Sequence, residues 1–394
     1  MTLVDLALIA IHSVIVYSWI VFPVLLALLR PRHRAAAENA VQGDAPQLAI
    51  VLSAYEEESC IGDRIRNLLE QDYPPGNWVA YIGVDGSKDR TGSEALAAAA
   101  GHDAIRVFVF QENRGKVAVL KDLVARAKAA SPAPDMLVFT DENTFYAADA
   151  MGRLAAPFTD PAIGGVCGKL SFKKAAGGET EENVYWRIEN WLKARESALD
   201  SCLGANGAIY AIRTSLFWEE IPANTIIDDF VIGMKVREKG YRLVYETRAL
   251  AVEALPLRIA DEWKRRVRIG AGDFQALRLC APCLTPSFGA FAWLFWSHKV
   301  LRWFTPHLAL AGAFFALIGA SFFRSPTAIL SLALYAAFGL AIAIGRQQFI
   351  RGGRVMQIFR GLQYLAAMQA AIFAGFLRFC RGNLEGRWQR SERD

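Results

Sequence analysis

Long apolar segments occupy both ends of this 394-residue chain and limit the folds that it can adopt. At the N-terminal end, residues 3–29 contain one acid, Asp5, and no Lys or Arg, and they are long enough to cross a hydrocarbon core of about 30 Å. A cleaved signal peptide is the alternative, but no basic region precedes the segment and no small-residue cleavage site follows it. Arg30, Arg32 and Arg34 follow directly. Because Lys and Arg favour the cytoplasmic side, we expect the next region of the chain to be cytoplasmic.

The C-terminal region of the sequence predicts further membrane helices. Residues 306–323 and 328–345 are apolar and are separated by a short turn, as in a helical hairpin, and a third apolar segment covers residues 361–379. The preceding residues 273–305 end in a mixture of bases and aromatics, which favours an amphipathic helix at the membrane interface. A complete span that begins at Phe288 is the alternative. This choice decides the side of the C-terminus: four spans, without the Phe288 span, would place the basic C-terminal tail outside, against the charge rule, so the number of spans and the side of the C-terminus stay open.

Composition argues against several classes of site and partner. The net charge of +5 comes mainly from arginines near the membrane segments, which suits anionic membrane lipids better than nucleic acid. The six cysteines are scattered, and a cytoplasmic domain is kept reduced, so we expect no structural disulfide. Cys280 and Cys283 have a metal-like spacing, but no second pair of ligands accompanies them, and we interpret them as small apolar residues near the membrane. The five histidines do not cluster in the sequence, which argues against a histidine metal site or a Ser-His-Asp triad.

Between the apolar ends, short strand patterns alternate with helical patterns. We expect strands at residues 48–52, 78–84, 106–110 and 136–140, and helices at residues 60–71 and 116–130. This spacing predicts parallel crossovers, and therefore an α/β fold with a central, mostly parallel sheet. Such sheets bind ligands at the carboxyl ends of their strands, where Tyr55, Glu56, Asp85 and Asp141 fall. The sequence contains neither a dinucleotide-binding nor a P-loop motif, so hydride transfer and ATP hydrolysis are not supported.

Five short motifs follow one another along this region: Ala54-Tyr55-Glu56, Val84-Asp85-Gly86-Ser87-Lys88-Asp89, Asn113-Arg114-Gly115-Lys116, Thr140-Asp141-Glu142-Asn143 and Asp228-Asp229. In this order they resemble the motifs of glycosyltransferase family 2, over about residues 47–272. The apolar flanks resemble those of the membrane-embedded cellulose, hyaluronan and exopolysaccharide synthases. The resemblance implies an inverting transferase with a nucleotide-sugar-binding domain of the glycosyltransferase A type, which moves a sugar from a nucleotide-sugar donor, UDP-linked, to a polysaccharide or lipid acceptor. It also implies a multi-pass protein of the inner or plasma membrane whose catalytic domain is cytoplasmic.

The chain then divides into six predicted parts: an N-terminal transmembrane helix (1–30), a linker (31–46), the cytoplasmic glycosyltransferase domain (47–272), an amphipathic interfacial segment (273–305), C-terminal transmembrane helices (306–380) and a polar tail (381–394).

The departure of a nucleoside diphosphate is assisted by a divalent cation that neutralises developing negative charge. Asp141, and Asn143 as a weaker neutral ligand, offer the oxygen atoms that suit Mg or Mn. The family usually has D-x-D where this chain has D-E-N, so a water molecule is an alternative intermediary at Asn143.

The remaining donor contacts follow from the resemblance. It implies that Tyr55, Glu56 and Asp85 hold the uridine and ribose, with Lys116 near the diphosphate or the base. Arg265 and Arg268 match part of the Q-x-x-R-W motif of processive synthases and are expected to bind the leaving diphosphate. The missing Gln and Trp weaken the case for processive synthesis. A basic face lying on lipid is the alternative for these arginines.

Sugar transfer with inversion needs a general base beside the acceptor hydroxyl, and a carboxylate suffices. By resemblance Asp229 is that base, and Asp228 orients it or the acceptor. The alternative is that both acids begin the helix predicted at residues 230–239, where acids are favourable, and the two roles are compatible.

Gly204, Asn206 and Trp186 are candidates for the acceptor side. The glycine permits close backbone approach to a sugar, with a plain turn as the alternative, and Trp186 suits stacking on a sugar ring, with core packing as the alternative. Two acceptors stay open, a growing polysaccharide and a membrane lipid. A membrane scaffold derived from an inactive transferase is the competing class, favoured only by the D-E-N change.

Overall fold

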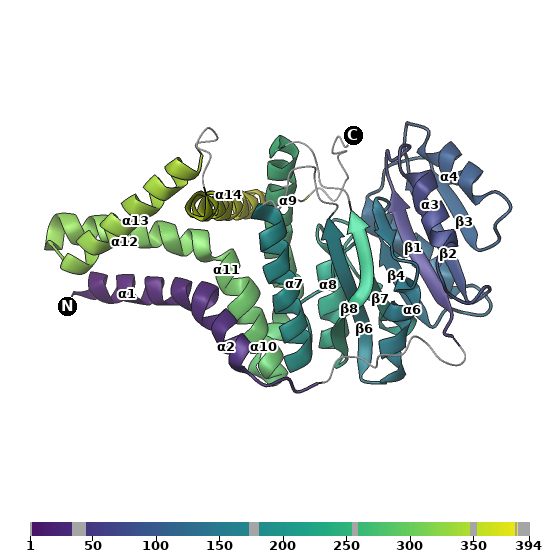
Figure 1. Ribbon diagram of the computed structural model, residues 1–394, viewed down its shortest axis with the longest axis horizontal. Helices are drawn as coiled ribbons and strands as arrows, with labels where there is room; N and C mark the ends of the chain where they lie inside the picture. Colours follow the sequence, from purple (N-terminus) through teal and green to yellow (C-terminus); the bar gives the residue numbers. More distant parts are fainter. Residues whose placement is uncertain are drawn as a thin grey trace.

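The computed structural model describes residues 2–33, 45–172, 181–253, 259–346, 353–382 and 384. Figure 1 shows two parts in contact, a sheet covered by helices at one end and a group of long apolar helices at the other. One hydrophobic core joins the two parts, because Phe22 and Leu26 of the N-terminal helix belong to the same buried cluster as Val51 of the sheet and Phe295 near the C-terminal helices.

The sheet has eight described strands in the order β3-β2-β1-β4-β7-β6-β8-β5. Their bounds are β1 Leu48–Ala54, β2 Trp78–Asp85, β3 Ile105–Phe110, β4 Met136–Thr140, β5 Thr144–Tyr146, β6 Ile163–Phe172, β7 Tyr210–Arg213 and β8 Arg242–Glu253. Strands β3, β2, β1 and β4 are mutually parallel, and β6 is parallel to β8. Strand β7 is antiparallel to β4 and β6, and β5 is antiparallel to β8. The prediction of an α/β fold with a mostly parallel sheet is therefore confirmed.

Helices cover both faces of this sheet. They are α3 Ile61–Leu69, α4 Thr91–Ala99, α5 Lys116–Lys128, α6 Ala150–Ala155, α7 Glu181–Leu199 and α8 Asp228–Glu238. Successive residues of a strand point to opposite faces. Accordingly, Ile50 and Leu52 of β1 pack with α3, α4 and α6, whereas Ala49 and Val51 pack with α5, α7 and α8. The parallel strands are buried on both faces, which explains why they are nearly continuous apolar runs in the sequence.

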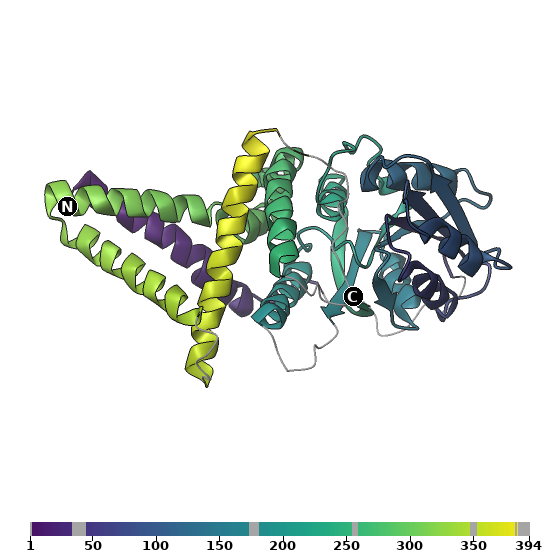
Figure 2. The same ribbon diagram turned by 90° about the horizontal axis from the view of Figure 1, so that it is seen from above.

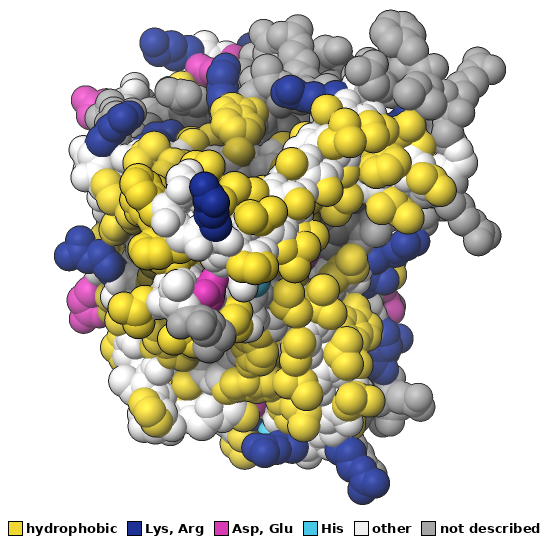
Figure 3. Space-filling model, turned by 90° about the vertical axis from the view of Figure 1, so that its left-hand side faces the viewer, with side chains coloured by type: hydrophobic (Ala, Val, Ile, Leu, Met, Phe, Trp, Pro, Cys, Tyr) yellow, Lys and Arg dark blue, Asp and Glu magenta, His cyan; other side chains and the backbone are white. Residues whose placement is uncertain are grey.

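The membrane-type helices lie together at the other end of the molecule. They are α1 Leu3–Val16 and α2 Phe22–Leu28, joined by a π-helical turn, together with α12 Thr305–Phe323, α13 Pro326–Gly345 and α14 Arg354–Cys380. Among the described residues, four helical segments are long and apolar enough to cross a membrane: Leu3–Leu28, Thr305–Phe323, Pro326–Gly345 and Val355–Cys380. Viewed from the end at which α12 turns into α13, the surface is dominated by hydrophobic side chains (Figure 3). Phe314, Leu317 and Leu334 are among these exposed residues.

Helix α14 runs across the direction of α1, α12 and α13. Figure 1 shows α14 end-on where the other three run lengthwise, and Figure 2 shows it crossing them. The sequence predicts a third C-terminal span at residues 361–379, and the structure gives this segment a helix of a different direction. The reason is its packing on α9 (Ile259–Leu279), where Gly270 and Gly375 allow the two backbones to touch.

Residues 273–305, predicted to form an interfacial segment, comprise the end of α9, two 3₁₀ turns and the short helices α10 (Ala290–Leu294) and α11 (Leu301–Trp303), which a π-helical turn connects. Many of their side chains are buried against the protein, including Phe291, Phe295 and Trp303. This segment therefore connects the α/β domain to the membrane-type helices, and its place at a membrane interface stays a prediction.

Candidate active site

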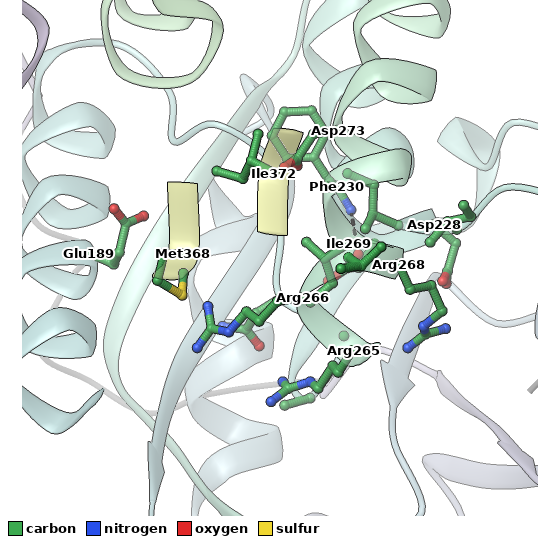
Figure 4. Close-up of a pocket in the computed structure, with 18 of the residues that line it drawn as sticks. Glu189, Asp228, Phe230, Arg265, Arg266, Arg268, Ile269, Asp273, Met368 and Ile372 are labelled. Atoms are coloured by element: carbon green, nitrogen blue, oxygen red, sulfur yellow. Dashed lines mark hydrogen bonds between the residues drawn. The ribbon is translucent and has the colours of Figure 1, made fainter. Parts of the chain in front are cut away.

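A pocket of about 630 Å³ opens where β1 and β4 end and where α7, α8, α9 and α14 meet. Figure 4 shows that several distant parts of the chain contribute its lining. The candidates that line it are Tyr55, Lys116, Asp141, Asn143, Trp186, Asn206, Asp228, Asp229, Arg265 and Arg268. Predicted donor, metal, catalytic and acceptor residues thus share one cavity.

Lys116 is the first residue of α5 and lies among the acids of the pocket. Its Nζ donates to Asp141 Oδ1 at 2.7 Å and is 4.0 Å from Asp228 Oδ1. Burial lowers the pKa of Lys116, but the charges of Asp141 and Asp228 outweigh burial and raise it above the usual lysine range. A fixed positive charge therefore stands at the carboxyl ends of the strands, where a diphosphate would find a partner.

Asp228 and Asp229 form the first turn of α8, with Asp228 buried. Asp229 Oδ1 accepts a hydrogen bond from the Phe230 backbone amide at 2.8 Å. Burial raises the pKa of both carboxyls, the proximity of Asp141 adds to the effect, and Lys116 opposes it. The two acids therefore begin the helix and also face the pocket, so the two roles weighed from the sequence coexist.

The glycine that brings the acids together is Gly207. A Cβ atom added there would lie 3.1 Å from Asp141 Oδ2 and 3.5 Å from Asp229 Oδ2, so Gly207 occupies the narrow space between these carboxylates. Gly204, the glycine proposed from the sequence, serves the fold instead. Its φ is +68°, and an added Cβ would be 2.3 Å from Cδ2 of Phe230. The glycine that lies beside the acids of the pocket is therefore Gly207, and the close approach of a glycine to a sugar stays a prediction.

The other acceptor candidates have mixed roles. Asn206 lines the pocket, and its side chain is also used within the protein: Nδ2 donates to the Gly168 carbonyl at 3.0 Å, and Oδ1 accepts from the Ile209 amide at 3.2 Å. Trp186 lines the pocket and packs against Phe172 with ring centroids 5.3 Å apart. Asn206 therefore shapes the loop that carries Gly207, and Trp186 combines packing with an accessible ring.

The three residues predicted to hold the uridine and ribose, Tyr55, Glu56 and Asp85, have different positions in the structure. Tyr55 lines the pocket. The Asp85 carboxylate accepts hydrogen bonds from the backbone amides of Arg114, at 2.9 Å, and Gly115, at 2.8 Å. Glu56 has a left-handed φ of +55°, and its amide donates to Ser87 Oγ. Asp85 and Glu56 thus hold together the loops that bring Tyr55 and Lys116 to the cavity.

Among the described residues, no group of three or more His, Cys, Asp or Glu side chains is arranged to hold a metal ion. Asn143 Nδ2 donates to Glu253 Oε1 at 2.7 Å, which fixes its amide. Mg²⁺ is commonly held by one or two carboxylates together with substrate phosphates. Asp141 fits this pattern as a protein ligand to a metal that arrives with a diphosphate donor.

Helix α9 supplies the basic wall of the pocket. Figure 4 shows Arg265, Arg266 and Arg268 projecting from this helix, with Asp228 and Phe230 of α8 on the facing side. Burial lowers the pKa of Arg268, and the neighbouring guanidinium groups of Arg265 and Arg378 lower it further. The arginines predicted to bind a diphosphate therefore do reach the cavity that contains Lys116.

Sequence reasoning did not single out Arg64, which lies beneath the Asp141 loop. Its side chain is fully buried; Nη2 donates to Thr140 Oγ1 at 2.9 Å and Nη1 to Asn67 Oδ1 at 2.6 Å. The guanidinium also lies 4.3 Å from the centre of the Tyr146 ring. A charged residue on the apolar face of a helix was the available signal, because Arg64 lies three residues after the buried Ile61 and four before the buried Leu68 on α3.

A second polar cluster, here called the membrane-side cluster, lies at the end of the pocket nearest the apolar helices. Glu189 of α7 accepts from His298 Nε2 at 3.2 Å, Lys299 Nζ at 3.0 Å and Arg302 Nη1 at 3.4 Å. The Arg302 guanidinium lies 4.7 Å from the ring centre of Trp19, and Trp19 Nε1 donates to Thr305 Oγ1 at 3.0 Å. The cavity therefore continues from the acids of the sheet to Trp19 of the first apolar segment and to α14.

An open α/β sheet with acids and a lysine at its strand ends, facing arginines on a following helix, defines a glycosyltransferase of the A type. A family model described as "Glycosyltransferase like family 2" matches residues 46–271, more than half of the chain, so the chain belongs to glycosyltransferase family 2. The predicted family, and with it the predicted enzyme class, are confirmed.

Known proteins support this assignment. The chain is 25% identical over 238 residues to a poly-beta-1,6-N-acetyl-D-glucosamine synthase of Staphylococcus aureus strain COL, covering 58% of this chain and 55% of that protein. It is 26% identical over 301 residues to an N-acetylglucosaminyltransferase of Rhizobium meliloti strain 1021, covering 71% and 67%. The chain thus spans about half the length of the first of these relatives.

Among solved structures, the fold is similar to that of the mannosyltransferase PcManGT from Pyrobaculum calidifontis, determined in complex with GDP-Man and Mn²⁺. The TM-score is 0.70, the sequences are 20% identical, and the match covers 96% of this chain and 99% of that one. The likeness extends over the apolar helices as well as the sheet, and at this identity it concerns the fold alone.

Proposed function

We propose that this protein is an inverting glycosyltransferase that moves a sugar from a nucleotide-sugar donor to a lipid-linked acceptor at the membrane surface. The observation that carries the proposal is that one pocket is lined by Lys116, Asp141 and Asp229 and also by Trp19 of the first apolar segment. Donor, base and acceptor can then meet in one cavity.

The donor end is suited to a sugar linked to a nucleoside diphosphate. Asp141 is the residue that would hold Mg or Mn together with the diphosphate, and the metal, when bound, would neutralise charge on the leaving group. Lys116, Arg265 and Arg268 are the cations that would bind the diphosphate oxygens. We propose a UDP-linked donor, and N-acetylglucosamine is the first sugar to test because both sequence relatives are named for it.

The base is Asp229. As the acceptor oxygen attacks the anomeric carbon, its proton passes to the Asp229 carboxylate while the bond from that carbon to the diphosphate breaks. A single displacement of this kind inverts the anomeric configuration. Asp228, between Lys116 and Asp229, positions the base, and burial of both acids raises their pKa, which improves Asp229 as a proton acceptor.

The lining at the membrane-side end supports a lipid-linked acceptor over a growing polymer. Leu365, Met368 and Ile372 of α14 and the ring of Trp19 give this end apolar walls. Of the described residues of α12 and α13, none lines the pocket, so the cavity does not continue between these two helices. A translocated polysaccharide needs a continuous hydrated path, whereas a lipid acceptor needs only access from the bilayer.

The test is nucleotide release by the detergent-purified protein with UDP-N-acetylglucosamine and other UDP- and GDP-sugars, with Mg or Mn, and with a membrane lipid extract as acceptor. We expect metal-dependent release and one labelled sugar in the organic phase, both lost in Asp229→Asn. The exposed Asp72→Asn is the matched control and should behave as wild type. A ladder of water-soluble products would favour the polysaccharide acceptor, and no release from any donor would favour an inactive scaffold.

A further inference from the structure

The C-terminal helix α14 contributes a wall to the pocket although it follows the family's matched region by more than eighty residues in the chain. Leu365, Met368, Gln369 and Ile372 line the cavity, and so does Arg378 in the last turn of the helix. Figure 4 shows Met368 and Ile372 facing the same cavity as the arginines of α9. The site is therefore incomplete without a helix that the sequence motifs do not include.

Backbone contacts hold α14 against the segment of α9 that carries the pocket arginines. A Cβ atom on Gly375 would lie 2.5 Å from the Ala271 amide nitrogen and 2.7 Å from the Val267 carbonyl oxygen. Gly270 also lies close to α14, since its added Cβ would be 3.0 Å from Cα of Ile372. About three turns before Gly375, α14 also meets Arg266, whose Nη2 donates to the Tyr364 hydroxyl at 2.9 Å. Position and orientation of α14 are thus fixed beside Arg265 and Arg268.

This packing gathers three guanidinium groups, those of Arg265, Arg268 and Arg378. All three line the same pocket. Burial lowers the pKa of Arg268, and the charges of Arg265 and Arg378 lower it further. A cavity wall that carries several guanidinium groups suits an anion with several oxygen atoms, and a diphosphate is such an anion.

We propose that Arg378 is a donor-binding residue that completes a three-arginine site for the diphosphate of the nucleotide-sugar. The inference rests on the proposed function and adds to it a residue outside the family's motifs. Helix α14 then has two tasks, to form the apolar wall along which the acceptor enters and to deliver a cation to the leaving group.

The experiment is equilibrium binding of UDP, GDP and inorganic pyrophosphate to the full-length protein in nanodiscs, in the presence of Mg or Mn, without turnover. We expect Arg378→Gln to weaken nucleotide binding by about tenfold or more, as for loss of a hydrogen bond between charged groups, and Arg378→Lys to restore part of it. Arg381→Gln is the control, because Arg381 follows α14 and is exposed. Pyrophosphate binding should fall in parallel with nucleotide binding.

A second pair of variants tests the geometry independently of the charge. Gly375→Ala places a Cβ into the α9 backbone and should weaken UDP and GDP binding, whereas Gly361→Ala, on the same helix with open space around it, should not. Comparing nanodiscs of zwitterionic and of anionic lipid separates the two possible sources of phosphate at the arginines, the nucleotide and the lipid headgroup. Unchanged nucleotide binding in Arg378→Gln and Gly375→Ala, or an effect seen only with anionic lipid, would overturn the inference. If the wild-type protein itself bound no nucleotide, the proposed function would fail instead.

Discussion

We expect Asp273 to make the free energy of unfolding of this protein depend on pH. The substitution Asp273→Asn should remove this contribution. The residue lies on α9 and lines the pocket, and it is 8% exposed. Burial raises the pKa of its carboxyl to about 8, and Glu189 adds to the effect, against the opposing charges of Lys299 and Arg266. At neutral pH the folded protein therefore holds Asp273 protonated, whereas the unfolded chain has it ionised.

The direction of this pH dependence follows from the number of protons that the folded and unfolded states bind. Below a pH of about 4 both states are protonated, and above about 8 both are ionised, so neither range contributes a slope. Between these values the folded state binds one proton more than the unfolded state, and the free energy of unfolding falls as pH rises. At about 1.36 kcal/mol per pH unit, the loss between pH 5 and pH 8 is about 4 kcal/mol. Asp273→Asn keeps the shape, stays neutral and should escape this loss.

The assay is thermal unfolding of the purified protein in detergent from pH 5 to pH 8, followed by tryptophan fluorescence. The apparent Tm of Asp273→Asn should exceed that of wild type by an amount that grows with pH, reaching several degrees at pH 8, at roughly 2 °C per kcal/mol. The other acids of the pocket affect both proteins equally and cancel in the difference. Asp72→Asn, at an exposed position, should follow wild type throughout. Parallel curves for wild type and Asp273→Asn would refute the reasoning.

Four further outcomes are expected. Asp229→Asn should lower kcat by about 10²-fold or more while leaving UDP binding within a few-fold of wild type, because general-base contributions are of that size, and single-turnover kinetics separates the two quantities. In the wild type, kcat/KM should fall on acidification at a higher pH than for an ordinary aspartate, because the pKa of Asp229 is raised; a profile flat down to pH 4 would contradict this. Lys116→Met should weaken binding of UDP by about tenfold, measured by calorimetry. Because α14 runs across the direction of α1, α12 and α13, a cysteine placed at Arg381 should be labelled from the same side as the α/β domain, and labelling from the opposite side would show that α14 spans the membrane.

Some of the site could be predicted from the sequence because it depends on local patterns and on a general property of parallel sheets. Strand β4 was predicted with its observed bounds, since five consecutive buried residues end abruptly at Thr140. The carboxyl ends of parallel strands meet at one edge, which is why Tyr55 and Asp141, far apart in sequence, both line the pocket. Motif order then supplied the family.

Other features depend on which surfaces pack together, and no local pattern encodes them. From the sequence, Gly204 and Gly207 are equally plausible as the glycine that lines the site. Only the structure separates them, because Gly204 packs against Phe230 whereas Gly207 lies beside two carboxylates. The ion pair between Glu189 and Lys299 joins residues 110 positions apart, and so cannot be read from spacing.

The sequence by itself determined the membrane-type ends, the α/β domain between them and the acids that carry the proposed chemistry, because apolar length, strand periodicity and motif order are local properties of a chain. The tertiary structure alone decided the direction of α14, the burial of Arg64 and the arrival of Arg378 beside Arg268. The physical reason is that helix packing is set by complementary surfaces, here the contacts at Gly270 and Gly375, which become neighbours only when the chain folds.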